Sequence, residues 1–559
     1  MAAADTLTAP RVSPIQRLWN RDLDRYPATG PRYYYLGLVV VTTIILYYQL
    51  YVGGAVATQI LGGYHMTFLY YVMILVITNA IGAFASLATG IADRIGRANL
   101  VVYGTIITSL MALIAVPHAQ TKFSFGVISA LTGLVEGVIL VATPALVRDF
   151  SPQVGRAAAM GFWTMGPVLG SLVVSEVSSH TVSHLNAWQD QYMIAGIVGL
   201  VVAFVALLTL RELSSRLRDQ VMVTLQEQTI LEIRARGLDV AEATRDPYRQ
   251  MFKPDILLSA LAISVFLLGY YTAVAFFPIY FQTVLNFSVS QSNSLETWYW
   301  SSNAIALIVF GTLSDKLSVR KPFMLAGGVF SVLVTISFLS KATHHNPSFS
   351  SIAVLLAFTG IWGGAAFAPW MASFTESVEE RNPALTATGL AVWGWLLRIV
   401  VAVAFLVLPH VVNSVTPLVN NGAQVQAAAN RNPVLVAEAT AHPDVFAQLA
   451  KYKNPKDIPP AVLNHAILTV GAPTLLLLQK PQAQADLKYL QAHAADVQAA
   501  QKSAPHQWQH WLWVCVGGQI FFIPMIFVLA GYWRPRRAKE ALAAHDRAIM
   551  GEQPAAQPV

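Results

Sequence analysis

The chain has 559 residues, of which 55% are hydrophobic and only 12% are charged, and its mean hydropathy is +0.51. Soluble globular domains carry about 25% charged residues, so this composition excludes an ordinary soluble enzyme. The net charge of +7 does not indicate a nucleic-acid partner, because the cations lie beside apolar runs, where they orient a membrane protein. The single cysteine, Cys515, excludes an intrachain disulfide.

The first half of the chain contains six apolar segments after a polar start. Residues 1–33 contain four prolines and no apolar core, so we expect a cytoplasmic segment without a signal peptide and with a short helix near residues 16–25. An N-terminal six-helix bundle is predicted over residues 34–210. Its apolar runs lie at about 35–61, 69–92, 99–118, 124–147, 157–180 and 190–210.

The second half repeats this pattern after a charged linker. Residues 211–255 are predicted to form a cytoplasmic linker with an amphipathic helix. Helices seven to eleven are expected within 256–413, and helix twelve within 510–533. The apolar runs lie at about 256–284, 294–313, 322–341, 350–373, 384–412 and 511–532. A polar, Ala- and Gln-rich insertion at 414–509 separates the last two runs, with helical stretches expected at 444–451 and 483–501, and a basic tail fills 534–559.

Charges in the short loops predict the orientation. The even-numbered loops are rich in cations, whereas the odd-numbered short loops carry only Lys122 and Lys341. By the positive-inside rule the even loops and both termini are cytoplasmic, and the long insertion is extracytoplasmic. The cations of the even loops are Arg94, Arg97, Arg148, Arg156, Lys316, Arg320, Lys321 and Arg381.

Two similar loops occupy equivalent places in the two halves. The run Thr-Gly-Ile-Ala-Asp-Arg-Ile-Gly-Arg covers residues 89–97, and Gly-Thr-Leu-Ser-Asp-Lys-Leu-Ser-Val-Arg covers residues 311–320. Further matches in the same order, including Pro144 with Pro369, indicate an internal repeat of six helices. The first loop resembles the Gly-x-x-x-Asp-Arg-x-Gly-Arg signature of the major facilitator superfamily, although Thr89 and Ala98 depart from it.

This resemblance implies an all-α membrane protein with twelve transmembrane helices in two pseudo-symmetric six-helix bundles, working by alternating access. It also implies that charged residues of the even loops form a conformational gate rather than a binding site. The gate candidates are Asp93, Arg94, Gly96, Arg97, Asp315, Lys316, Arg320, Arg148, Arg156 and Arg381.

Ionisable residues inside the predicted spans are the main candidates for chemistry, because such residues are costly in a membrane. Glu136 lies midway along helix four, and Arg398 lies within helix eleven. We interpret Glu136 as a proton-coupling or cation-binding group, and Arg398 as an anchor for an anionic solute or a partner of an acid such as Glu296. Two other interpretations stay open: a neutral Glu136 that only packs helices, and an Arg398 that reaches the cytoplasmic interface.

Helix five contains Gly166-Pro167 followed by Gly170. This run resembles the Gly-Pro-x-x-Gly-Gly signature of proton antiporters in the superfamily, with Ser171 in place of the last glycine. The resemblance favours exchange or efflux, whereas a generic packing kink is the alternative.

Helices seven and eight are rich in aromatic residues. Tyr270, Tyr271 and Trp298 are candidates for lining a binding cavity, and Asn293 and Asn303 for hydrogen-bonding a solute. The alternative for the aromatic residues is the belt at the membrane interface.

We therefore predict a non-enzymatic secondary transporter of a small metabolite or organic anion in the cell membrane, coupled to protons. Its expected partners are the small-molecule substrate, membrane lipid and a candidate protein at the insertion; we expect function as a monomer, no nucleic acid, no metal and no cofactor beyond a proton or ion gradient. The alternatives are a multidrug/proton antiporter and a non-transporting sensor or scaffold that uses residues 414–509. The sequence contains no phosphate-binding Gly-x-x-x-x-Gly-Lys-Ser/Thr loop, so it does not indicate a primary pump.

Overall fold

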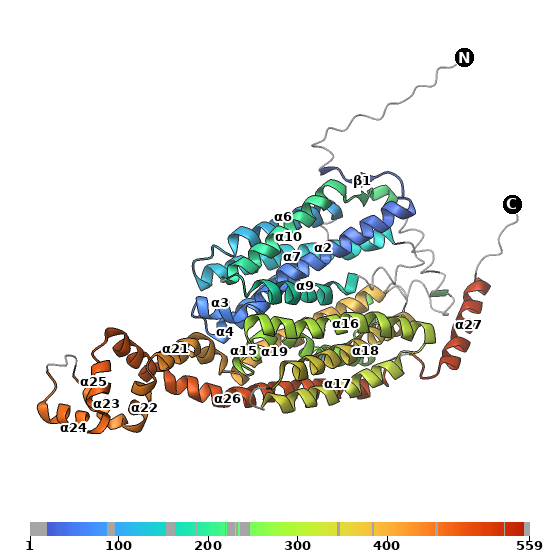
Figure 1. Cartoon of the computed structure of the whole chain (residues 1–559). Coiled ribbons are helices and arrows are strands. Elements are labelled where there is room, and N and C mark those ends of the chain that lie inside the picture. The colour runs from blue at the N-terminus through green and yellow to red at the C-terminus, as the bar shows by residue number, and fades with distance from the viewer. Residues whose placement is uncertain are drawn as a thin grey trace, which may run out of the picture.

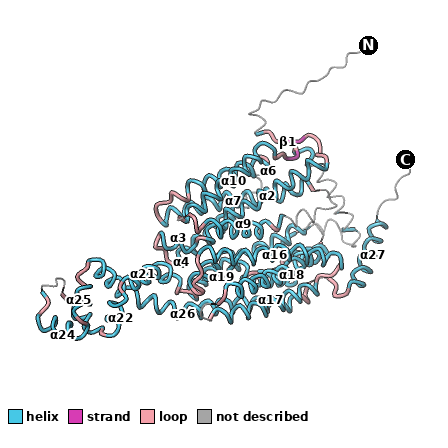
Figure 2. Tube along the Cα trace, in the orientation of Figure 1, coloured by secondary structure: helices cyan, strands magenta, loops and turns pink. Residues whose placement is uncertain are grey.

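The computed structural model describes most of the chain as helix, apart from one two-residue strand pair (Figure 2). The described residues are 19–85, 95–151, 163–185, 187–218, 220, 230, 233–234, 246–343, 347–382, 385–452, 457–529 and 531–552. Two groups of roughly parallel helices lie side by side, and a smaller helical unit projects beyond one end of them (Figure 1). We call the end that bears this unit the insertion end, and the opposite end, where β1 (Asp22–Leu23) and α27 (Pro535–Glu552) lie, the terminal end.

The first group of helices is formed by the first half of the chain. It comprises α2 (Thr29–Ala55), α3 (Ala57–Gly63), α4 (Phe68–Ala85), α6 (Arg97–Leu110) with the π-helical turn η1 (Met111–Ala115), α7 (Lys122–Phe150), α9 (Gly166–Thr181) and α10 (Trp188–Thr209).

The second group is formed by the second half. It comprises α13 (Pro247–Met251), α14 (Pro254–Phe266), α15 (Leu268–Thr283), α16 (Val289–Leu317), α17 (Lys321–Ala342), α18 (Phe349–Arg381), α19 (Thr386–Val411), the last part of α26 (Pro481–Met525), and α27 (Pro535–Glu552) at the terminal end.

Nine spans within the described residues are long and apolar enough to cross a membrane. The α9 and α16 helices and the last part of α26 lie where the other three of the twelve predicted spans are expected. The fold is thus the predicted all-α membrane fold of two helical bundles. Most of the predicted linker helix falls outside the described residues.

The short helix predicted near residues 16–25 lies partly outside the described residues, and within them only Trp19 is helical. Asp22–Leu23 instead forms the strand β1, which pairs in parallel with β2 (Glu212–Leu213) after α10. The Arg21 side chain, 1% exposed, donates from Nη1 to the carbonyl of Leu210 at 3.0 Å and from Nε to Asn99 Oδ1 at 2.9 Å. The last carbonyl groups of a helix need donors from outside it, and Arg21 supplies one to α10.

The insertion is far more helical than the sequence indicates. It contains α20 (Val415–Pro417), η3 (Leu418–Gly422), α21 (Ala423–Arg431), α22 (Pro433–Ala441), α23 (Pro443–Leu449), α24 (Pro460–Val470) and α25 (Ala472–Leu477), and no helix end marks the expected boundary at residue 510. The 45-residue helix α26 runs from this unit into the bundle without interruption. At 1.5 Å per residue, its part before residue 508 is about 40 Å long and acts as a stalk.

Candidate functional site

A cavity of about 640 Å³ lies between the two halves of the molecule. Both halves contribute to its wall, which is mainly aromatic and apolar. Tyr47, Tyr51 and Trp163 line it from the first half, and Tyr270, Tyr271 and Trp393 from the second. A cavity of this size and lining is typical of a site for a small organic molecule.

Arg398 supplies a cationic side chain to the cavity wall. It lies twelve residues after the start of α19 at Thr386, about 18 Å along the helix, and therefore near the middle of the bundle. Tyr47 and Tyr271 line the same cavity, so its wall contains hydroxyl groups as well as this cation. This position favours the predicted role in binding over contact with the membrane interface.

Glu136 lies at the centre of α7 and is 2% exposed. Neither of its carboxyl oxygens has a hydrogen-bond partner among the described residues. Glu136 itself does not line the cavity. A buried carboxyl group without a partner is stable in its protonated form, so Glu136 is suited to hold a proton.

Glu296 lies on α16, 3% exposed, at the contact between the two halves. The sequence suggests Glu296 as a partner for Arg398, but its Oε2 accepts hydrogen bonds from Ser175 Oγ of α9 at 3.3 Å and from Trp300 Nε1 at 3.4 Å. The other oxygen, Oε1, is buried without a partner in the described part of the chain. The Trp300 ring lies 5.2 Å from the ring of Tyr270, so aromatic contacts connect this carboxyl group to the cavity.

Further hydrogen bonds join the halves near Glu296. Thr58 Oγ1 of α3 donates to Gln282 Oε1 of α15 at 2.7 Å. Asn293 Nδ2 donates to the carbonyl of Ala55 at 3.1 Å. All of these contacts lie toward the insertion end, so the molecule is closed there; we call this set of contacts the closed seam. Asn293 therefore serves the seam rather than the cavity.

The predicted gate residue Arg97 binds two acidic residues of the first half, Asp149 and Glu212, that were not predicted as gate residues. Arg97 Nη1 donates to both carboxyl oxygens of Asp149 at 2.8 and 2.9 Å, and its backbone N–H donates to Glu212 Oε2 at 2.8 Å. Gly96 has φ +98°, a conformation that favours glycine. Asp93, Arg94 and Arg156 lie outside the described residues.

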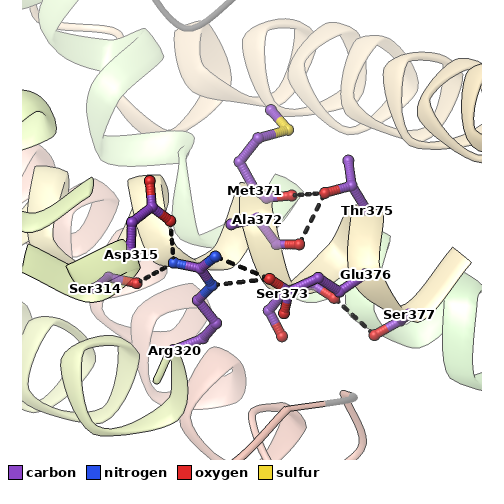
Figure 3. A network of polar contacts seen from close by, with 9 residues as sticks. All are labelled: Ser314, Asp315, Arg320, Met371, Ala372, Ser373, Thr375, Glu376 and Ser377. Carbon is purple, nitrogen blue, oxygen red and sulfur yellow. Dashed lines mark hydrogen bonds and ion pairs between the residues drawn. The ribbon is translucent and has the colours of Figure 1, made fainter. Parts of the chain in front are cut away.

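Arg320 is the centre of the equivalent cluster in the second half, as Figure 3 shows. Its Nε and Nη2 donate to Glu376 Oε1 at 3.0 and 2.9 Å, and its Nη1 donates to Ser314 Oγ at 2.7 Å and to Asp315. Arg381 Nη2 donates to Asp255 Oδ2 at 2.6 Å. These contacts connect helices of the same half. The side chains of Arg148 and Lys316 are exposed.

The helix-five motif packs α9 against α2. A Cβ atom on Gly170 would lie 2.5 Å from Tyr47 Cβ, which is too close for any side chain. Gly166 lies near Thr43 in the same way, and Pro167 lines the cavity. The motif thus brings helix five close to the cavity residue Tyr47.

The remaining aromatic and asparagine candidates differ in whether they line the cavity. Trp298 is 53% exposed and is not among the residues that line the cavity, which fits the alternative role at the membrane interface. Asn303 lines the cavity and donates to the carbonyl of Gly360. Tyr47 and Tyr51 were missed by the sequence interpretation, although their four-residue spacing on one helix face was a usable signal.

Within the described residues, no group of three or more His, Cys, Asp or Glu side chains could hold a metal ion. Among the described residues that line the cavity, the polar groups include the guanidinium of Arg398, hydroxyl groups and side-chain amides, and the carboxyl groups of Glu136 and Glu296 are not part of the lining.

Comparison with known proteins shows similarity to transporters. The probable anion transporter 3 of Arabidopsis thaliana is 25% identical over 42% of this chain and 46% of its own length. The cis,cis-muconate transport protein of Acinetobacter baylyi is 20% identical over 53% of this chain and 67% of its own length. This chain thus spans about half to two thirds of the length of these curated relatives.

The fold is also similar to that of a bacterial homologue of the human lysosomal transporter Spinster, solved in an inward-facing and unoccupied conformation. The TM-score is 0.57 with 15% sequence identity, and the match covers 95% of this chain and all of the other. The family model described as Major Facilitator Superfamily matches residues 38–402, which include both predicted loop motifs and most of both halves. The chain therefore belongs to the major facilitator superfamily of membrane transporters.

Proposed function

We propose that this protein is a secondary active transporter that carries an organic anion with an aromatic or unsaturated body by alternating access, coupled to protons. The observation that carries the proposal is Arg398, which projects a permanent positive charge into a cavity whose other lining is mainly aromatic. A guanidinium group binds a carboxylate with two parallel hydrogen bonds, and aromatic rings bind a flat apolar body. The names of the relatives, an anion transporter and a muconate transport protein, support the same substrate class.

The orientation that we propose has both termini in the cytoplasm and the insertion outside, in the cell membrane. It is supported by the cations of the even loops, three of which, Arg97, Arg320 and Arg381, lie at ends of α6, α17 and α18 and form ion pairs there. In this orientation the closed seam lies on the extracytoplasmic side, so the transporter is in an inward-facing state.

Proton coupling is assigned to Glu136 and Glu296. Both carboxyl groups are almost fully buried, and both have at least one oxygen without a partner among the described residues. Ionising either group in this state leaves an unpaired charge away from water, which costs several kcal/mol. A change to a conformation that hydrates the carboxyl group removes this cost, so proton release and conformational change are linked.

The test uses purified protein in liposomes with an imposed pH gradient. We expect uptake of cis,cis-muconate or benzoate, with binding weakened roughly tenfold to a hundredfold by Arg398→Gln, since a hydrogen bond to a charged group contributes about 1.5–3 kcal/mol. Arg398→Lys keeps the charge but loses the two parallel N–H donors of the guanidinium group, so its affinity for the anion should be intermediate. The control is Arg537→Lys, which changes an exposed arginine of α27. Unchanged anion binding in Arg398→Gln would contradict the proposal.

A multidrug/proton antiporter is the second candidate, favoured by the Gly166-Pro167 motif beside the cavity and by its apolar lining. Such a protein should bind cationic and neutral aromatic drugs, and Arg398→Gln should improve binding of the cations because it removes a repulsive charge. A sensor or scaffold, in contrast, should show ligand binding without solute flux.

A further inference from the structure

The first turns of the insertion touch the opposite half of the molecule. The backbone N–H of Phe68, at the start of α4, donates to Thr416 Oγ1 of α20 at 2.9 Å. Asn420 Nδ2 of η3 donates to the carbonyl of Met66 at 3.1 Å. Met66 and Phe68 are almost fully buried, at 0% and 1% exposure. The segment Val415–Gly422 therefore covers the α3–α4 connection of the first half.

The same segment is held firmly to the second half. It follows directly from α19, and Val415 is fully buried. The backbone N–H of Ser414 donates to Gln507 Oε1 of α26 at 3.0 Å, and Tyr489 Oη of α26 donates to Asn421 Oδ1 at 3.0 Å. Because α19 and α26 belong to the second half, the segment must move with that half.

We infer that residues Val415–Gly422 form a gate that holds the insertion end closed, so that the insertion is a working part of the transport cycle rather than an accessory unit. This inference rests on the alternating access proposed above. When the halves separate at the insertion end, the α3–α4 connection moves away from α19 and α26. Both hydrogen bonds, from Phe68 to Thr416 and from Asn420 to Met66, must then break, whereas they remain intact while the opposite end opens.

The gate segment acts at a different place from the closed seam. The seam joins helices within the bundle, such as α9 and α16 through Ser175 and Glu296. The gate segment lies outside the bundle and connects to the stalk of α26, which bears the outer helical unit. A force or a ligand that acts on the outer unit is therefore transmitted to the gate segment through a continuous helix.

The test measures the distance across the insertion end by electron-spin labels. Cysteines replace the exposed Gln120, before α7, and Ser350, in the first turn of α18, in a Cys515→Ala background. The variant Thr416→Val/Asn420→Ala removes both gate hydrogen bonds. We expect the population with the longer distance to increase roughly tenfold relative to the shorter one, because two hydrogen bonds of ordinary strength are lost from the closed state alone.

The matched control is Thr469→Val/Asn430→Ala, which makes the same substitutions at exposed insertion positions. Thr469 bonds only to the carbonyl of His465 in its own helix, and Asn430 accepts from Gln426. This variant should keep the wild-type distance distribution. An unchanged distribution in the gate variant, with the protein still folded by circular dichroism, would overturn the inference.

A second measurement locks the gate segment in place instead of weakening its contacts. Cysteines at the exposed Thr67 and at Asn420, joined by a short reducible cross-linker, should fix the closed state and stop transport until the linker is reduced. Transport that continues at the full rate in the cross-linked protein would also overturn the inference. Because the distance measurement needs no substrate, an incorrect substrate class leaves it unaffected, whereas a protein without alternating access shows one distance under all conditions.

Discussion

Replacing Arg320 tests whether the polar cluster at the terminal end stabilises the second half. The Arg320 side chain is 14% exposed and joins α16 to α18 through Asp315 and Glu376. Burial disfavours the charged guanidinium, but the carboxylates of Glu376 and Asp315 outweigh this and raise the pKa of Arg320. The guanidinium of Arg320 is therefore positively charged at physiological pH.

The expected loss of stability follows from the contacts that each substitution removes. Arg320→Gln loses two hydrogen bonds to Glu376 and those to Ser314 and Asp315. Glu376 and Asp315 are 40% and 68% exposed, so each ionic contact contributes about 1 kcal/mol rather than the larger value of a buried pair. The free energy of unfolding should fall by about 2–4 kcal/mol in Arg320→Gln, and by about 1–2 kcal/mol in Arg320→Lys, which keeps the charge and loses the fork.

The assay is thermal and denaturant unfolding in detergent, followed by tryptophan fluorescence. The control is Arg536→Gln, because Arg536 pairs with Glu540 at 2.9 Å but is 91% exposed, and such pairs contribute little. We expect no measurable change in that variant. Equal stability of Arg320→Gln and Arg536→Gln would refute the reasoning, since burial of the guanidinium is the difference between the two pairs.

Three further predictions follow from other parts of the structure. Glu136→Gln should abolish pH-driven accumulation but retain solute exchange between equal pH values, measured in liposomes; accumulation at the wild-type level would contradict the coupling role. Gly170→Leu should reduce folded yield in size-exclusion chromatography, because its side chain would overlap Tyr47, whereas Gly30→Leu has free space and should not. Hydrogen bonds from Arg431 lower the pKa of Asp486 from 3.8 to about 2. Hydrogen-exchange protection of α21 should therefore be complete above pH 4 and fall as the pH approaches 2. Unchanged protection across this range would contradict the pairing.

The membrane fold could be predicted from the sequence because its signals are local. A span needs only about twenty consecutive apolar residues, and the repeated loop motifs show the two halves directly. The start of the chain could not be predicted in this way. Arg21 binds Asn99 and the carbonyl of Leu210. Leu210 is 189 residues away in the sequence, and no local sequence pattern predicts such a contact.

The site was predicted in part, for a similar reason. A charge within a span is informative in itself, so Glu136, Glu296 and Arg398 could be selected from the sequence. The spacing of Tyr47 and Tyr51 places them on one helix face, but which way that face points depends on how the helices pack. The partners of charged groups could not be predicted either, because they are distant in the sequence: Arg97 binds Asp149, 52 residues later.

The insertion and the buried carboxyl groups act on one equilibrium under these proposals. Glu296 bonds across the closed seam through Ser175, and Thr416 bonds across the gate to Phe68. Each contact exists only while the insertion end is closed, so each adds to the stability of that one state. Ionising Glu296 leaves a buried charge with Oε1 unpaired among the described residues, and loss of the gate hydrogen bonds removes contacts of the closed state, so both changes should shift the molecule toward opening at the insertion end. Since the seam and the gate share no residue, their effects on the free energy of opening should be approximately additive.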